Sequence, residues 1–214
     1  MKMVLHSYWR SSCSWRVRIA LNLKGVSYET VSVHLVADGG HQHQEAHQAI
    51  NPMREVPVLV VDEQPLAQSL AILEYLEESY PEPPLLPAEA MARSRVRQMA
   101  EIINSGIQPI QNLRVMQKLG KDFDLSKDKQ RSWSKDWIEF GFTGLHRLIE
   151  THGGQYSYGD SVTLVDLCLI PQLYNARRFD VDLNAYPKLL EIEARLNAIP
   201  AFEQAHPDQQ PDAV

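Results

Sequence analysis

Small hydroxyl and thiol side chains are concentrated in the run Ser11-Ser12-Cys13-Ser14, between an expected strand at 3–8 and an expected helix at 15–24. At a helix start the first backbone N–H groups lack an intrahelical partner and the helix dipole is positive, so an anion is stabilised there. That anion could be the Cys13 thiolate or a thiolate brought by a ligand. A structural helix cap with a small buried cysteine explains the same residues. Dithiol redox chemistry is not expected, because no Cys-x-x-Cys motif is present.

Two further dipeptides lie where a peptide-like ligand can be bound. Val56-Pro57 opens an apolar, β-branched segment at 56–61, and a proline in a sheet belongs at the first residue of a strand or in a turn. A cis bond there would let the Val56 backbone pair with an extended peptide, whereas a trans proline on an edge strand is the commoner arrangement. Gln68-Ser69 precedes an amphipathic segment and indicates either a carboxylate site at a helix start or a plain N-cap.

Histidine and arginine side chains give weaker signals. His41, His43 and His47 include an i,i+4 pair, but no carboxylate or thiolate clusters with them. We therefore expect solvated loop and helix positions rather than a metal site, and no metal is predicted. Arg177-Arg178 indicates either an anionic substrate or solvent-facing cations near a helix end.

The elements that would position these residues alternate between strand-like and helical patterns over the first 81 residues. This alternation predicts a mixed α/β domain at 1–81 with the order βαβαββα. The expected strands are 3–8, 28–33, 56–61 and a return strand after the turn at 62–65, and the expected helices are 15–24, 45–50 and 68–80.

A proline-rich segment at 82–87 predicts a stiff linker, and the pattern beyond it is helical, so 88–214 is expected to form an all-α domain. Thr163 and Asp166 form a capping signal before an apolar helix at 164–178. A last helix is expected to begin at Pro187 and to end near Pro200, with a polar tail after it.

The composition is that of an ordinary globular protein: 214 residues, 44% hydrophobic and 22% charged. The formal net charge of −6 and the lack of a dense basic stripe disfavour nucleic-acid binding. No apolar run approaches the ~20 residues of a membrane span, and the N-terminus does not resemble a signal peptide. The 2 cysteines are too few for a disulfide framework. A cytoplasmic protein without nucleic-acid or membrane partners is therefore expected.

Taken together, these segments resemble the zeta class of glutathione transferases, the maleylacetoacetate isomerases. The resemblance rests on 11–21, Asn51-Pro52, Val56-Pro57 and 68–76, and it continues through 106–113, 159–169 and Tyr186-Pro187, which is nearly the whole chain. The Ser-Ser-Cys stretch is specific to this class, whereas the Val-Pro and Gln-Ser pieces are shared by glutathione transferases in general. The resemblance implies a thioredoxin-like N-terminal domain, an α-helical C-terminal domain, bound glutathione and a homodimer.

The resemblance also implies roles for individual residues. Ser11 would donate its hydroxyl to the glutathione sulfur and lower the pKa of the thiol, with Ser12 and Cys13 beside it in the catalytic set. Pro57 would be cis, the Val56 backbone would pair with the cysteinyl segment, and Gln68-Ser69 would hold the γ-glutamyl carboxylate. Arg178 would bind the substrate, with Arg10 or Arg16 as weaker candidates. The other positions implied for the glutathione and substrate site are Ser14, Trp15, Arg16, Gln42, Gln108, Asn112, Leu113 and Arg114.

The activity that the resemblance implies is conversion of maleylacetoacetate, a small dianionic acid, to fumarylacetoacetate in aromatic amino-acid catabolism. Glutathione would add to the cis double bond, allow rotation and be eliminated unchanged. Arg114 and Arg177 depart from the commonest pattern and could alter the preferred acid. The alternatives are maleylpyruvate isomerase, a general glutathione transferase or α-halo acid dehalogenase, and a non-enzymatic ligand-binding module. Tyr8 is a rival to Ser11, because other transferase classes use a tyrosine near the first strand.

Overall fold

The structure, a computed structural model, describes residues 2–213, which form two compact units. Residues 2–84 and 197–213 make up the first unit, and residues 85–196 make up the second. We expected domains at 1–81 and 88–214. The structure instead groups residues 197–213 with the first unit. The reason is a helix at 200–205 that packs along the first helix of the chain, a contact without any local sequence signal.

The first unit is built on a four-stranded sheet with the order β2-β1-β3-β4. Its strands are β1 (Met3–Ser7), β2 (Glu29–Ser32), β3 (Val58–Val61) and β4 (Gln64–Ala67). β1 pairs in parallel with β2, while β3 runs antiparallel to both β1 and β4. Leu5 and Leu59, paired in this register, are fully buried at the centre of the sheet.

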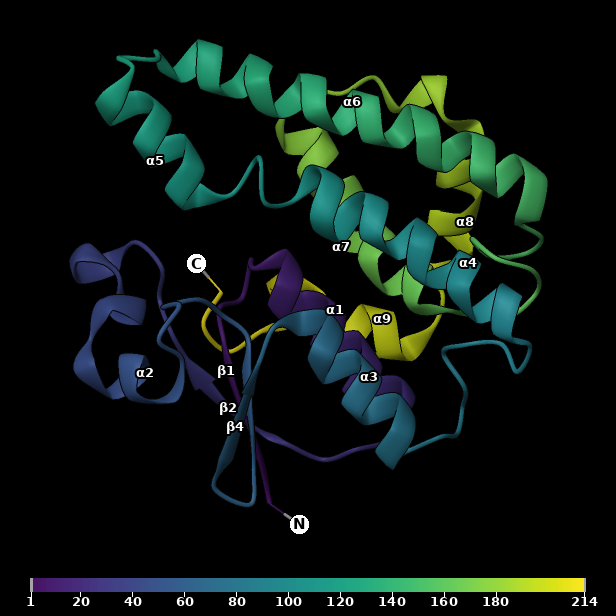
Figure 1. Ribbon diagram of the computed structural model, residues 1–214, viewed down its shortest axis with the longest axis horizontal. Helices are drawn as coiled ribbons and strands as arrows, with labels where there is room; N and C mark the ends of the chain where they lie inside the picture. Colours follow the sequence, from purple (N-terminus) through teal and green to yellow (C-terminus); the bar gives the residue numbers. More distant parts are fainter. Residues whose placement is uncertain (1, 214) are drawn as a thin grey trace. The chain divides into compact units, whose positions relative to one another are not determined.

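Helices cover both faces of this sheet. α1 (Ser12–Leu23) and α3 (Ser69–Ser79) lie on one side, and α2 (Glu45–Ile50) lies on the other (Figure 1). α9 (Pro200–Ala205) packs against α1. The order β1-α1-β2-α2-β3-β4-α3 confirms the predicted βαβαββα thioredoxin-like arrangement. β3 begins at Val58 rather than Val56, because Pro57 has no N–H for the sheet ladder. The Val56–Pro57 peptide is cis, as predicted.

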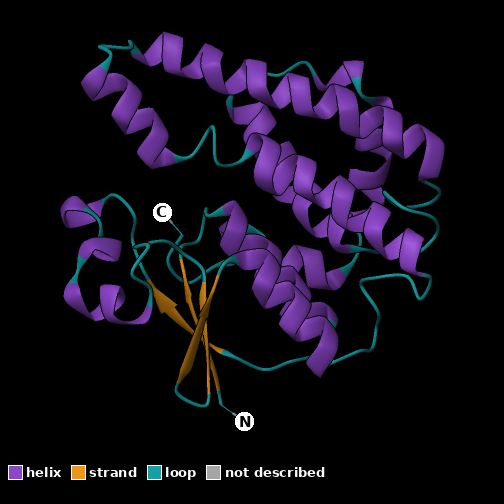
Figure 2. Ribbon diagram, viewed as in Figure 1, coloured by secondary structure: helices purple, strands orange, loops and turns teal. Residues whose placement is uncertain are grey.

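All regular elements described in the second unit are helical (Figure 2). They are α4 (Ala90–Glu101), a π-helical segment (Ile102–Ile107), α5 (Leu113–Asp122), α6 (Lys127–His152), α7 (Leu164–Arg178), a 3₁₀ turn (Leu183–Ala185) and α8 (Pro187–Asn197). α7 spans the predicted 164–178 and begins with the predicted capping box of Thr163 and Asp166. The helix is buried along most of its length and packs against α4, so it forms the centre of this unit.

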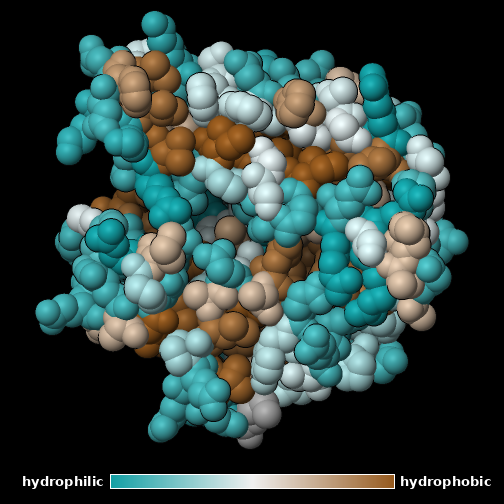
Figure 3. Space-filling view, in the orientation of Figure 1, coloured by the Kyte–Doolittle hydropathy of each residue, from teal (hydrophilic) through white to brown (hydrophobic). Residues whose placement is uncertain are grey.

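Some large hydrophobic side chains remain exposed. Phe140 on α6 is 76% exposed and Phe123 after α5 is 66% exposed. In Figure 3 hydrophobic residues form separate patches among hydrophilic ones on the visible face. None of the helices within residues 2–213 is both long and apolar enough to cross a bilayer.

Candidate active site

A tight turn connects β1 to α1 and carries Ser11 at its end. The Ser11 N–H donates to the Tyr8 carbonyl at 2.9 Å, which closes the turn over Tyr8–Ser11. Ser11 is the N-cap of α1, and its Oγ accepts from the Ser14 N–H at 3.2 Å. The first turn of α1 contains no acidic side chain, so the positive end of its dipole is not compensated from within the helix. This corner therefore favours a bound anion next to the Ser11 hydroxyl.

The residues after Ser11 differ in how accessible they are. Cys13 is partly exposed, whereas the side chains of Ser12, Ser14, Trp15 and Arg16 are buried. Through its side chain Cys13 can reach a ligand more readily than Ser14, which is fully enclosed. Contacts between a ligand and the buried side chains of this run would need movement of the helix start, so their backbone groups are the better donors.

Arg16 connects the start of α1 with the start of α3. Its Nη1 donates to the Ser69 Oγ at 3.3 Å, and both side chains are buried. Gln68, the N-cap of α3, has a left-handed φ of 70° and an exposed side chain, whose Nε2 donates to the Glu55 Oε2 at 3.4 Å. The predicted segments at 11–16 and 68–69 are thus joined by a direct contact, and Gln68 also contacts Glu55, the residue before Val56.

The loop before the cis Val56–Pro57 peptide is fixed by two side chains that the sequence did not single out for this purpose. The His47 Nε2 and the Asn51 Nδ2 each lie 2.9 Å from the Glu55 carbonyl. His47 is 6% exposed, so the expectation of a solvated position was wrong for this residue, although His43 is exposed and His41 partly so. His47 is buried because its imidazole faces from α2 toward the loop that contains Glu55 and lies within hydrogen-bonding distance of the Glu55 carbonyl.

Gln42 is another predicted site residue and lies in a short 3₁₀ turn (His41–His43). It is 8% exposed, and its Nε2 donates to the Leu35 carbonyl at 3.2 Å. Its Oε1 is buried and accepts no hydrogen bond within the described part of the chain. A buried acceptor without a partner is the kind of atom that a ligand N–H satisfies.

Tyr8, the rival of Ser11, is buried in an apolar cluster with Trp9, Val33 and Val56. Its ring also lies edge-on to the His34 ring at 5.0 Å between centroids. The Tyr8 side chain is packed in this cluster, whereas Ser11 lies at the start of α1. Ser11 is therefore the better placed of the two to donate a hydrogen bond to an anion at the helix start.

The remaining predicted glutathione or substrate residues form one stretch of the second unit. Gln108 is buried directly after the π-helical segment, and its N–H donates to the Ile103 carbonyl at 2.9 Å. Asn112 caps α5 by accepting from the Arg114 N–H at 3.2 Å, and both Leu113 and Arg114 are exposed. Asn112, Leu113 and Arg114 therefore start α5 with exposed side chains, whereas Gln108 is buried before it.

The arginines at the end of α7 have different partners. Arg177 makes a bidentate ion pair with Glu193, and this hydrogen bonding raises the pKa of Arg177. Arg178 is exposed and donates to the Asn175 Oδ1 at 3.2 Å. In the first unit, the Arg10 guanidinium lies over the Trp9 ring at 5.2 Å. A carboxylate thus neutralises Arg177, while Arg178 presents an exposed guanidinium in the last turn of α7.

Within residues 2–213, no group of three His, Cys, Asp or Glu side chains converges as metal ligands would. His41, His43 and His47 instead contact protein groups such as Asp38, Gln42 and Glu55.

Arg18 and Asp212 are the residues near this corner that the sequence did not indicate. Arg18 is fully buried and donates to the Trp9 carbonyl at 2.9 Å, and Asp212 accepts from the Trp9 N–H at 3.1 Å. The sequence signal for Arg18 was a charged residue between Val17 and Ile19 in an apolar helical segment. The structure buries residues 14–21 of this helix, Arg18 included. Asp212 follows no such pattern, because its partners are distant in sequence.

The chain matches known proteins over both units. Residues 5–84 match the sequence model of the glutathione S-transferase N-terminal domain, and residues 114–204 match that of the C-terminal domain. The maleylacetoacetate isomerase of Rattus norvegicus is 48% identical over 211 residues, which cover 99% of this chain and 95% of that protein.

Solved structures agree with the sequence matches. The holo structure of a maleyl pyruvate isomerase, described as a bacterial glutathione S-transferase of the zeta class, is similar with a TM-score of 0.95 at 44% identity, covering 99% of this chain and 100% of that one. The maleylacetoacetate isomerase of Anaeromyxobacter dehalogenans, with dicarboxyethyl glutathione and citrate bound in its active site, gives a TM-score of 0.89 at 46% identity and covers 100% of this chain and 94% of that one. The chain therefore belongs to the glutathione S-transferase family, in the zeta class that includes the maleylacetoacetate isomerases.

Proposed function

We propose that this protein is a glutathione-dependent isomerase that converts maleylacetoacetate to fumarylacetoacetate. The observation that carries the proposal is Ser11, a hydroxyl at the uncompensated start of α1. A hydroxyl and helix-start N–H groups together stabilise a thiolate, because preorganised donors lower the energy of an anion. The names of the similar proteins support the same activity.

The first unit offers groups that fit glutathione, a tripeptide with a thiol, peptide bonds and terminal carboxylates. Val56 lies outside both strand registers, two residues before β3, so its backbone is suited to pair with the cysteinyl segment. Gln68 and Ser69 are at the start of α3, where a carboxylate is stabilised. The buried Oε1 of Gln42 can accept from a ligand N–H. We therefore assign glutathione to these residues and to Ser11–Arg16.

When bound, glutathione supplies a thiolate that adds to the cis double bond, permits rotation about the resulting single bond and is released unchanged. Ser11 donates its hydroxyl to the sulfur and keeps it ionised. We assign Ser12 and Cys13 to the same thiolate site. Ser12 would contribute through its backbone in the first turn of α1, and Cys13 through its partly exposed side chain.

The dianionic substrate requires cations in a chain with a net charge of −6. We assign one substrate carboxylate to Arg178, an exposed guanidinium at the end of α7, as the family resemblance implies. Arg10 is the second candidate for an acidic group, and Gln108, Asn112, Leu113 and Arg114 are proposed to line the glutathione and substrate site.

A second candidate substrate is maleylpyruvate. It is favoured by the similarity to the maleyl pyruvate isomerase, which has the TM-score of 0.95. Assays of maleylacetoacetate and maleylpyruvate with the same enzyme, compared by kcat/KM, decide between them. We also propose that the protein acts as a cytoplasmic homodimer, as the family resemblance implies.

The proposed function is tested with Ser11→Ala. We expect kcat for the isomerisation to fall by about 100-fold or more, because one preorganised donor to the developing anion is lost. The thiolate absorbance of bound glutathione in the ultraviolet should decrease at neutral pH. Wild-type turnover that continues without glutathione would refute the proposed function, and near-normal turnover of Ser11→Ala would move the role to Ser12, Cys13 or the backbone.

Ser126→Ala is the matched control for loss of a helix cap. Ser126 is the N-cap of α6, and its Oγ accepts from the Lys129 N–H at 3.3 Å, much as Ser11 accepts from Ser14 at 3.2 Å. Both variants should lose about 1 kcal/mol of stability. Only Ser11→Ala should lose turnover.

A further inference from the structure

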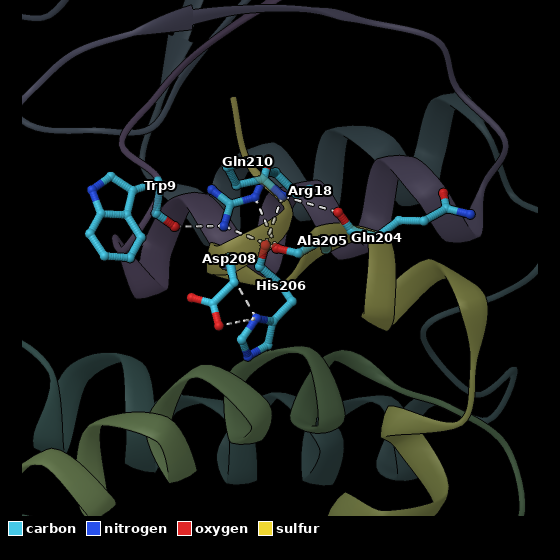
Figure 4. Close-up of polar contacts among 7 residues, drawn as sticks. All are labelled: Trp9, Arg18, Gln204, Ala205, His206, Asp208 and Gln210. Carbon is cyan, nitrogen blue, oxygen red and sulfur yellow. Dashed lines mark hydrogen bonds and ion pairs between the residues drawn. The ribbon is translucent and has the colours of Figure 1, made fainter. Parts of the chain in front are cut away.

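The segment 207–213, here called the C-terminal strap, lies against the turn that carries Ser11. The strap contains a short 3₁₀ turn (Pro207–Gln209) and is closed by the Ala213 N–H, which donates to the Gln210 carbonyl at 3.1 Å. The Gln210 Nε2 donates to the carbonyls of Gln204 at 3.0 Å and His206 at 2.9 Å, so the strap is held to the end of α9 (Figure 4).

Asp212 connects this strap to the turn and to the sheet. Its Oδ2 accepts from the Trp9 N–H at 3.1 Å and from the Ser32 Oγ at 2.9 Å, at the end of β2. Trp9 is the second residue of the turn Tyr8–Ser11, which is closed by the Ser11 N–H. A carboxylate is a strong acceptor for a backbone N–H, so Asp212 fixes the plane of the peptide that enters the turn.

Arg18 holds the other side of the same turn. Its Nη2 donates to the Trp9 carbonyl at 2.9 Å and to the Ala205 carbonyl at 3.0 Å (Figure 4). Its Nη1 donates to the Ser7 Oγ at 3.1 Å. Both backbone groups of Trp9 are therefore occupied, the carbonyl by α1 and the N–H by the strap. Burial lowers the pKa of Arg18 to about 10, and the charges of Tyr28 and Asp212 oppose this shift.

Apolar packing joins the strap to a second part of the proposed glutathione site. Ala213 is partly buried against the cluster of Tyr8, Trp9, Val33 and Val56. This cluster includes two residues of the turn as well as Val56, the residue before the cis peptide. The strap thus supports both the helix start and the proposed peptide-binding edge.

We propose that Asp212 is a positioning residue for the thiolate site: by holding the Trp9 amide, the C-terminal strap sets the orientation of Ser11. The inference rests on the proposed function, since it assigns to the strap an effect on the glutathione sulfur. Asp212 acts through Trp9 and the turn and does not touch the reacting atoms.

The test compares Asp212→Ala with wild type in the full chain. Loss of a hydrogen bond to a charged acceptor should raise the exchange rate of the Trp9 amide by about tenfold, measured by hydrogen–deuterium exchange across 8–11. The pKa of the bound glutathione thiol should rise toward its solution value. As a result kcat should fall at neutral pH and recover at higher pH, with the KM for the dianionic acid unchanged. Asp212→Asn, which keeps an acceptor oxygen, should restore part of each effect.

Asp208→Ala is the matched control. Asp208 carries the same charge in the same strap, but it is exposed and its carboxylate contacts His206 instead of the turn. Equal exchange in wild type and Asp212→Ala, or equal effects of the Asp208 and Asp212 variants, would overturn the inference. Faster exchange with an unchanged thiol pKa and pH profile would also overturn it, because Asp212 would then hold the turn without affecting the sulfur. If wild type itself binds no glutathione, the proposed function fails together with the positioning role. A titration of wild type with glutathione identifies that outcome.

Discussion

Replacing Asp166 by alanine removes the acceptor on which the start of α7 depends. Asp166 is fully buried, and its Oδ1 accepts from the Ser157 N–H at 2.9 Å. Its Oδ2 accepts from the Thr163 N–H at 2.7 Å and from the Thr163 Oγ1 at 3.1 Å. These bonds fasten the loop before α7 to its first turn. Without them, buried donors are left without a partner at the centre of the second unit.

The size of the effect follows from these contacts. A hydrogen bond to a charged group contributes roughly 1.5 kcal/mol at the lower end of its range, so three such bonds amount to about 4.5 kcal/mol. We use the lower end because burial raises the pKa of Asp166, which shows that enclosing the carboxylate offsets part of the gain. We therefore expect a loss of about 4 kcal/mol, against a total stability on the order of 5–15 kcal/mol.

Urea unfolding followed by far-ultraviolet circular dichroism at neutral pH measures this loss. Asp160→Ala is the control: its exposed carboxylate accepts from one backbone N–H, that of Gln155 at 2.9 Å, and its removal should cost under about 1 kcal/mol. If Asp166→Ala does not fold, Asp166→Asn, which keeps one acceptor oxygen, should still show a loss of about 2 kcal/mol. A loss below about 1 kcal/mol for Asp166→Ala, with an unchanged spectrum, would refute the reasoning.

Two further predictions concern pH and the substrate. Burial and the neighbouring His47 lower the pKa of His6, so the unfolded chain binds this proton more readily than the folded protein, and the free energy of unfolding should decrease as the pH falls below about 6.5. His6→Gln should flatten that slope in urea titrations, and an unchanged slope would exclude His6 as its source. Arg178→Ala should raise the KM for dianionic maleyl acids by about tenfold and leave the KM for the neutral electrophile chlorodinitrobenzene unchanged. Arg177→Ala, which removes a charge already paired with Glu193, should change neither KM, and equal effects of Arg178→Ala on both substrates would remove it from the substrate site.

Local chemistry was enough to predict most elements of the fold. The capping box of Thr163 and Asp166 and the helix it starts were predicted at their observed positions, because the interactions that define them lie within one helical turn. The place of Ser11 between a strand and a helix was predicted for the same reason, since a small hydroxyl before an apolar helical segment is a local cap signal.

Several boundaries and environments depended on contacts between distant parts of the chain. The solvated setting expected for His47 was wrong, because its burial depends on the Glu55 carbonyl in the following loop. The last segment of the chain joins the first unit through contacts such as the Asn22 Nδ2 with the Ala201 carbonyl at 3.1 Å, a pair separated by 179 residues.

The sequence by itself determined which residue types stand at each helix start, and it therefore predicted an anion site at Ser11 that could stabilise a thiolate. The tertiary structure alone decided which groups hold that corner in place. Arg18 and Asp212 reach the two backbone groups of Trp9 from α1 and from a segment 203 residues further along the chain. Hydrophobic periodicity and capping act over a few residues, so no local pattern can encode a partner that only folding brings into hydrogen-bonding distance.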